Sequence, residues 1–124
     1  MDTSIDTHLT DVTVDTLEQW REAIRSSLQY YADIPYRYGD IKTYVVTSED
    51  RSHFMLMNEG WEGHRRVHGC IVHAEIRDSK IWMHYDGIED SITKELVAAG
   101  VPKERIVLAF QPVEVREQTE YAVA

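Results

Sequence analysis

Histidines and a single cysteine give this chain its clearest potential for metal chemistry. Zinc in proteins is usually held by three or four such ligands. The candidate ligands fall in one stretch of the chain: His64, His68, Cys70, His73 and His84. No CxxC is present, no HxxxH lies on an expected helix, and strand alternation puts His68 and Cys70 on one face and His73 on the other. A metal-assisted hydrolase is therefore the weaker of the alternative functions.

The stretch Gly60–Cys70, GWEGHRRVHGC, also combines an aromatic residue with basic ones. Aromatic side chains stack on bases and arginines bind phosphate, which makes a direct DNA-binding accessory factor an alternative function. The candidate contacts with DNA or a protein partner are Trp61, Arg65, Arg66 and His68. However, neighbouring arginines on a strand point to opposite faces, and a net charge of -9 repels phosphate. A corner at Gly60–Gly63, with Trp61 packed beneath the sheet, is the simpler interpretation.

Two further sets of residues have structural explanations. Cys70 has basic neighbours on its strand face, but cysteine is among the most often buried residues, so we expect an inert core thiol. Asp78-Ser79-Lys80 resembles part of a nuclease metal site, yet it falls where a hairpin turn is expected. The chain contains no G-x-S-x-G, P-loop or G-x-G-x-x-G motif. We therefore expect a protein without catalytic residues, metal or cofactor.

Composition indicates one globular domain. The chain has 124 residues, of which 43% are hydrophobic and 28% are charged, and this length is enough to bury a core. The one cysteine forms no internal disulfide, which fits a reducing cytoplasm. No apolar run reaches the ~20 residues of a membrane helix, and the polar, acidic first residues lead us to expect no secretory signal. We expect a partly flexible acidic leader at residues 1–15 and a single domain at residues 16–124.

Two helices are predicted from apolar residues spaced three and four apart. The first begins at Thr16, which forms a capping box with Gln19, and ends before Pro35. Its apolar stripe is Leu17, Trp20, Ile24, Leu28 and Tyr31. The second helix is capped by Asp90 or Ser91 and stops at Gly100. Its buried stripe is Ile92, Leu96 and Ala99.

Five strands are predicted from β-branched and aromatic runs separated by turn residues. They cover residues 41–48, 53–59, 65–77, 80–86 and 105–112, and the last is apolar on both faces, as in a central or covered strand. On the third strand, Cys70, Val72, Ala74 and Ile76 are assigned to the core. Residues 113–124 give no clear element. The sum is an α+β fold: a four-strand antiparallel meander plus a fifth strand, with both helices packed on it.

Four segments together are distinctive: YADIPYRYGDI (31–41), NEGWEGHRRVHGCIVHAEIRDSKIWMHYDG (58–87), ELVAAGVPKERIVLAF (95–110) and TEYAVA (119–124). They resemble the XisI family, the fdxN element excision controlling factor proteins of cyanobacteria. Their order and spacing extend the resemblance over residues 16–124.

The resemblance implies a small accessory protein that acts with a partner, XisH, so that the recombinase XisF excises a DNA element during heterocyst differentiation. XisH resembles restriction-type nucleases, and no catalytic residues of XisI proteins carry over to this chain. We therefore expect a non-catalytic, cytoplasmic regulatory protein of site-specific recombination that binds an XisH-like protein. An acidic surface would suit a basic partner of that kind. Self-association is also expected, through apolar residues at Val45, Val46, Phe110 and Tyr121–Val123.

Overall fold

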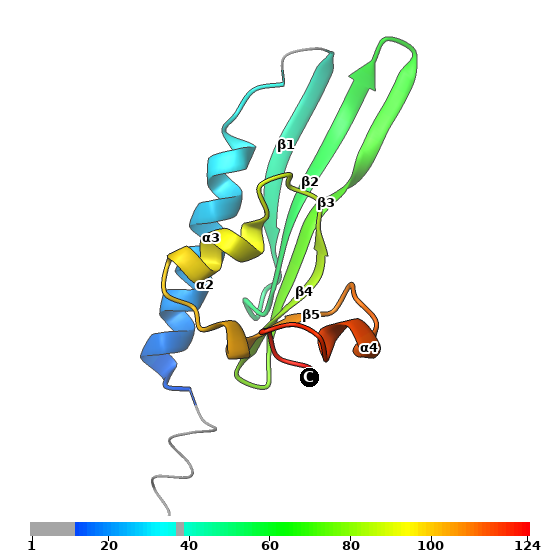
Figure 1. Cartoon of the computed structure of the whole chain (residues 1–124). Coiled ribbons are helices and arrows are strands. Elements are labelled where there is room, and N and C mark those ends of the chain that lie inside the picture. The colour runs from blue at the N-terminus through cyan, green and yellow to red at the C-terminus, as the bar shows by residue number, and fades with distance from the viewer. Residues whose placement is uncertain (1–11, 37–38) are drawn as a thin grey trace, which may run out of the picture.

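The computed structural model describes residues 12–36 and 39–124 and confirms the α+β class (Figure 1). The helices are α2 (Val14–Ala32), α3 (Ile92–Ala98) and α4 (Val113–Arg116), with a 3-10 turn at Lys103–Arg105. The strands are β1 (Asp40–Thr47), β2 (His53–Glu62), β3 (Arg65–Arg77), β4 (Lys80–Asp86) and β5 (Ile106–Leu108). No helix in the described ranges is long and apolar enough to span a membrane. Residues 1–11 of the predicted flexible leader lie outside the described residues.

Helix α2 begins at Val14, two residues before the predicted start. Thr13 caps the helix, because its Oγ1 accepts a hydrogen bond from the Thr16 backbone N–H at 3.1 Å. The predicted capping box on Thr16 is therefore wrong: Thr16 already lies inside the first turn. The apolar stripe is confirmed, since Trp20, Ile24 and Leu28 are buried.

Strands β1 to β4 form the predicted antiparallel meander, and β5 joins the β4 edge in parallel. Helix α3 provides the crossover that a parallel connection requires. Strand β5 is shorter than predicted and lies at the edge of the sheet, so of the two predicted alternatives, central or covered, the covered one is confirmed. Ile106 and Val107 are fully buried, and the Ala122 N–H donates to the Ile106 carbonyl at 2.9 Å.

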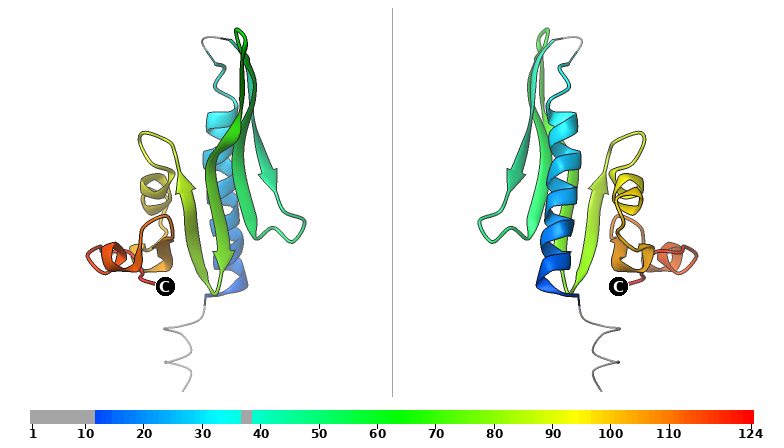
Figure 2. Two further views of the ribbon diagram at one scale, coloured as in Figure 1. Left: turned by 90° about the vertical axis from the view of Figure 1, so that its right-hand side faces the viewer. Right: turned by 90° about the vertical axis from the view of Figure 1, so that its left-hand side faces the viewer.

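Helices α2 and α3 pack on each other and on one face of the sheet (Figure 2). The hydrophobic core fills the space between this helical layer and the strands. Its largest fully buried side chains come from α2, all four strands after β1, and α3, and they include Leu28, Phe54, Leu56, Met83, Leu96 and Ile106. The opposite face of β1–β3 carries no helix from the described part of the chain (Figure 2).

A β-bulge in β3 changes which residues face the helices. Leu56 lies opposite Val72, but Met57, the next residue of β2, lies opposite Cys70, so Ile71 is the extra residue on β3. The bulge reverses the alternation in the first half of β3. Cys70 is therefore exposed on the helix-free face, and its assignment to the core is wrong.

The predicted corner at Gly60–Gly63 is also wrong. Gly60 and Trp61 continue β2 and pair with β3, and the turn is formed by Gly63 and His64. Glycine is needed at position 60 because β1 passes very close: a Cβ there would lie 2.0 Å from the backbone oxygen of Asp40. Trp61 is 50% exposed and does not anchor a corner beneath the sheet.

Candidate functional site

The helix-free face of the sheet, here called the open face, is the candidate functional site. Strand register places there the even-numbered residues 40–46 of β1 and the odd-numbered residues 53–61 of β2. On β3 it carries residues 66, 68 and 70 before the bulge and residues 73, 75 and 77 after it. A register shift at His84 in β4 brings both His84 and Tyr85 to this face, beside Trp82 and Lys80.

Three of the four predicted contact residues meet on the open face. The Arg66 guanidinium donates to Glu59 Oε2 at 3.0 Å and lies 5.4 Å from the centre of the Trp61 ring. His68 lies opposite Glu59 on the neighbouring strand. Arg65 points to the other face and pairs with a carboxylate of β2 at 2.9 Å. The predicted separation of the two arginines is confirmed.

A cluster of three histidines around Glu75 occupies the other end of the open face. His53 Nδ1 lies 3.0 Å from His73 Nε2, and His84 Nε2 lies 2.8 Å from Glu75 Oε1. The second carboxylate oxygen of Glu75 is 3.5 Å from His53 Nε2. The ring centroids of His73 and His84 are 4.7 Å apart. We call these four residues the histidine cluster.

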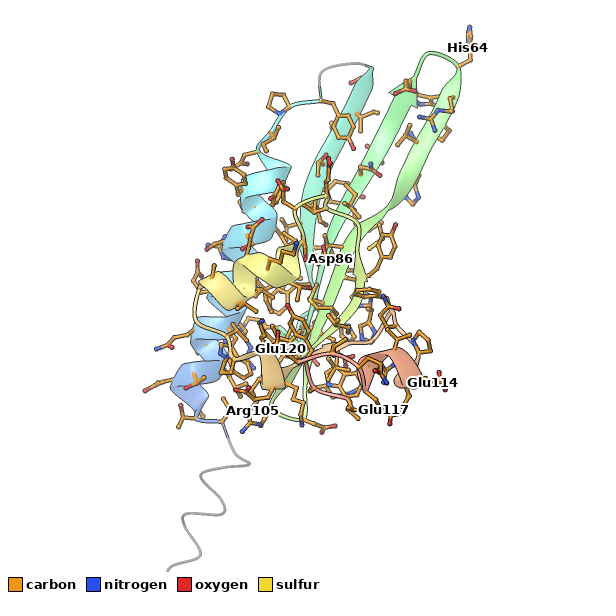
Figure 3. All side chains as sticks on the ribbon, viewed as in Figure 1. His64, Asp86, Arg105, Glu114, Glu117 and Glu120 are labelled. Atoms are coloured by element: carbon orange, nitrogen blue, oxygen red, sulfur yellow. The ribbon has the colours of Figure 1, made fainter. Side chains whose placement is uncertain are left out.

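The histidine cluster differs from the predicted metal ligands. It contains His73 and His84 and adds His53. It leaves out His68, Cys70 and His64, and His64 projects from the tip of the β2–β3 turn (Figure 3). Among the described residues, no three His, Cys, Asp or Glu side chains are arranged to hold a metal ion. The two ring nitrogens of His53 point to different partners, so the cluster is a hydrogen-bonded network.

The prediction that His73 faces away from His68 is wrong, because the bulge at Ile71 brings both to the open face. Sequence reasoning also missed His53. In the structure, the pairing of β2 with β3 puts His53 opposite Glu75. A register count from the β2–β3 turn alone puts His53 opposite Ala74, so the bulge also hid this residue from sequence reasoning.

Three titratable groups of the open face have shifted pKa values. Burial, together with the neighbouring His84 and His53, lowers the pKa of His73 and favours the neutral ring. Burial raises the pKa of Glu75, but the hydrogen bond from His84 and nearby charges outweigh it, so its pKa is lowered. The atoms packed around the Cys70 sulfur raise the pKa of the thiol, although the residue is exposed. Cys70 is thus not an activated nucleophile.

The Asp78-Ser79-Lys80 tripeptide forms the predicted turn. Asp78 and Ser79 adopt left-handed backbone conformations, with φ of 54° and 58°, between β3 and β4. Ser79 also accepts a hydrogen bond from Arg105 through its backbone oxygen at 3.4 Å. The tripeptide therefore has a turn-forming role in this fold.

A second surface is formed by the C-terminal segment, beyond the β5 edge (Figures 1 and 3). Its apolar side chains Phe110, Val113 and Val115 are 44%, 47% and 40% exposed. The same segment carries the exposed carboxylates of Glu114 and Glu117 (Figure 3). We call these five residues the C-terminal patch. Sequence reasoning assigned no element to most of this segment, because the single turn of α4 is too short to give a periodic pattern.

Arg116 fixes the C-terminal patch in place. Its guanidinium donates to three backbone carbonyl oxygens: Gln111 at 2.9 Å, Val123 at 3.1 Å and Ala109 at 3.4 Å. One side chain thus satisfies carbonyl groups of an otherwise irregular segment. The patch is a shaped surface rather than a loose tail, with apolar groups pointing outward.

Comparison with known proteins gives a family and two similar structures. The family model described as XisI protein matches residues 14–123. A crystal structure of a XisI-like protein from Anabaena variabilis ATCC 29413 is 34% identical, with a TM-score of 0.78, covering 87% of this chain and 99% of that one. The fdxN element excision controlling factor XisI from the same organism is 28% identical, with a TM-score of 0.73, covering 87% and 98%. Among curated proteins there is no match.

Proposed function

Because this chain belongs to the XisI family, we propose that it is a non-catalytic regulator of programmed DNA element excision that acts by binding an XisH-like protein. One similar structure is named an fdxN element excision controlling factor, and this name supports a role in excision control. The partner and the mode of binding are our proposal for this chain.

The C-terminal patch is the observation that carries the proposal. Its exposed apolar side chains, Phe110, Val113 and Val115, offer apolar surface that a partner can bury. Its two carboxylates offer negative charge. A protein that handles DNA presents cations to phosphate, and those cations also attract a carboxylate-rich surface. A net charge of -9 adds a long-range attraction toward such a partner. Binding there would place the regulator over the DNA-contacting surface of the partner.

The proposal is tested by co-expressing the chain with an XisH-like protein and measuring complex formation by size-exclusion chromatography. We expect a complex at ~50 mM salt that weakens as salt is raised, because exposed charge pairs are screened. Absence of a complex at low salt would contradict the proposal. Fluorescence-labelled XisH-like protein then gives the dissociation constant for each variant.

Two variants locate the contact. Glu117→Lys should weaken binding about tenfold or more, because it converts an attraction into a repulsion within the C-terminal patch. Glu49→Lys is the matched control: it makes the same charge change at an exposed position in the β1–β2 turn, away from the patch. Equal losses for both variants would assign binding to net charge alone and reject the patch as the docking site.

A further inference from the structure

The open face has the composition of a protein interface. Protein interfaces are enriched in aromatic residues, methionine and arginine, and their strongest contacts are often made by Trp, Tyr and Arg. On the open face Tyr44, Trp61 and Tyr85 are 38%, 50% and 52% exposed. Met55 and Met57 lie on the same face of β2, between β1 and β3. An aromatic, methionine-containing surface of this kind is costly to leave in water.

The charge of the open face differs from that of the whole chain. It carries four basic residues, Lys42, Arg66, Arg77 and Lys80, and three acidic ones, Asp40, Glu59 and Glu75. It is therefore close to neutral on a chain of net charge -9. Two copies of an acidic chain repel each other through most of their surfaces, and this repulsion is smallest where their neutral faces meet.

The open face is also large enough for a stable contact. Strand β2 has 10 residues and β3 has 13. With strands ~4.8 Å apart and ~3.3 Å per residue, β1–β4 present a projected area on the order of 600 Å². Side chains make the accessible area larger than the projection, and a standard interface takes ~800 Å² from each partner. The open face is therefore of the same order of size as one partner's share of a standard interface.

We propose that the open face binds a second copy of this chain, so that two sheets pack face to face. A two-fold axis through the middle of the face would bring the aromatic and methionine side chains of both copies into contact and exclude water from them. A nucleic acid fits less well, because Arg66 and Arg77 are already paired with Glu59 and Glu75. The inference goes beyond the proposed function and uses a different surface from the C-terminal patch.

Cys70 provides a direct probe of this dimer. It is the only cysteine of the chain, it is exposed, and it lies opposite Met57 in the middle of the open face. Face-to-face packing would cover it. We expect the rate of alkylation of Cys70 to fall about tenfold or more as the protein is concentrated above its dissociation constant. An unchanged rate from about 1 to 100 µM would overturn the proposal.

Sedimentation supplies the second measurement, with two variants. The wild-type mass should rise from 14.4 kDa toward twice that value over the same concentrations. Met57→Glu places a carboxylate in the middle of the face and should keep the chain monomeric, with circular dichroism verifying its fold. Val115→Glu, in the C-terminal patch, should leave the dimer intact. A dimer that persists in Met57→Glu, or a monomeric wild type, would refute the open face as its interface.

The same experiments separate the two proposals. Met57→Glu should still bind the XisH-like protein, and Val115→Glu should lose that binding while remaining dimeric. A third arm adds single-stranded DNA to dilute monomer at ~50 mM salt. If the DNA protects Cys70 from alkylation under these conditions, the open face belongs to a nucleic acid and the dimer proposal fails.

Discussion

Asp86 should be among the most important polar residues for the stability of this fold. It ends β4, and its carboxylate accepts four hydrogen bonds from the start of α3. The donors are the Ser91 hydroxyl at 3.0 Å, the Ile92 N–H at 3.1 Å, and the N–H and hydroxyl of Thr93 at 3.0 and 2.8 Å. Asp86 therefore connects the sheet to the helix that leads to β5 and the C-terminal patch (Figure 3).

The cost of Asp86→Ala follows from these contacts. Thr93 is only 4% exposed, so its hydroxyl would lose its acceptor in a buried place, at about 1–3 kcal/mol. Loss of the bonds to the helix N-terminus costs about 1 kcal/mol more, and loss of the charge there about 0.5 kcal/mol. We expect the free energy of unfolding to fall by about 3 kcal/mol. Asp86→Asn keeps one acceptor oxygen and should cost less, about 1–2 kcal/mol.

Urea denaturation followed by circular dichroism measures this loss. Glu89→Ala, at an exposed position in the same loop, is the control and should change the stability by less than ~0.5 kcal/mol. Adding Thr93→Val to Asp86→Ala should recover part of the loss, because the buried hydroxyl is removed together with its acceptor. If Asp86→Ala costs less than ~1 kcal/mol, or if Thr93→Val gives no recovery, the reasoning is refuted.

Three further perturbations test other parts of the structure. Burial and two neighbouring histidines lower the pKa of His73 below 6.5 in the folded chain. The unfolded chain therefore binds a proton at this histidine more readily than the folded chain does. Stability should therefore fall as the pH drops below about 6.5, and urea titrations at pH 7 and 5 should show a smaller drop for His73→Gln. The hydrogen bond to Glu95 raises the pKa of Tyr31 to about 12. Stability should thus decrease as the pH rises above about 10, and Tyr31→Phe should remove that decrease in urea titrations that compare neutral pH with pH values above 10. Gly60→Ala should lower the melting temperature more than Gly63→Ala. A Cβ at position 60 would collide with β1, whereas a Cβ at position 63 would meet no other atom. Gly63→Ala should therefore cost only the backbone strain of a left-handed alanine, about 1 kcal/mol.

The parts of this fold that sequence could predict are those set by local periodicity. The stripe of Trp20, Ile24 and Leu28 recurs every three to four residues, and one face of a helix is the direct consequence. The turn of the β3–β4 hairpin was also predictable, since its residues tolerate left-handed backbone and the strand residues next to it, 74–77 and 80–83, alternate regularly. In both cases the information lies within a few neighbouring residues.

The parts that sequence could not predict depend on tertiary contacts. The bulge at Ile71 inserts one residue into β3, and its only sign is the register with β2. One shifted residue moved Cys70 from the expected core to solvent and brought His68 and His73 to the same face. Gly60 was interpreted as a corner because glycine is common in turns, whereas its actual role is to let β1 approach β2.

The two register shifts explain why this face of the sheet is suited to an interaction. Without the shift at Ile71, Arg66, His68 and Cys70 would lie on the face of the sheet that carries the helices. Without the shift at His84, the side chains of His84 and Tyr85 would lie on opposite faces of the sheet. Both shifts therefore move polar and aromatic side chains from the helical layer to the open face. A bulge sacrifices regular backbone pairing, and here that cost is offset by a face rich in groups that a protein partner can bury.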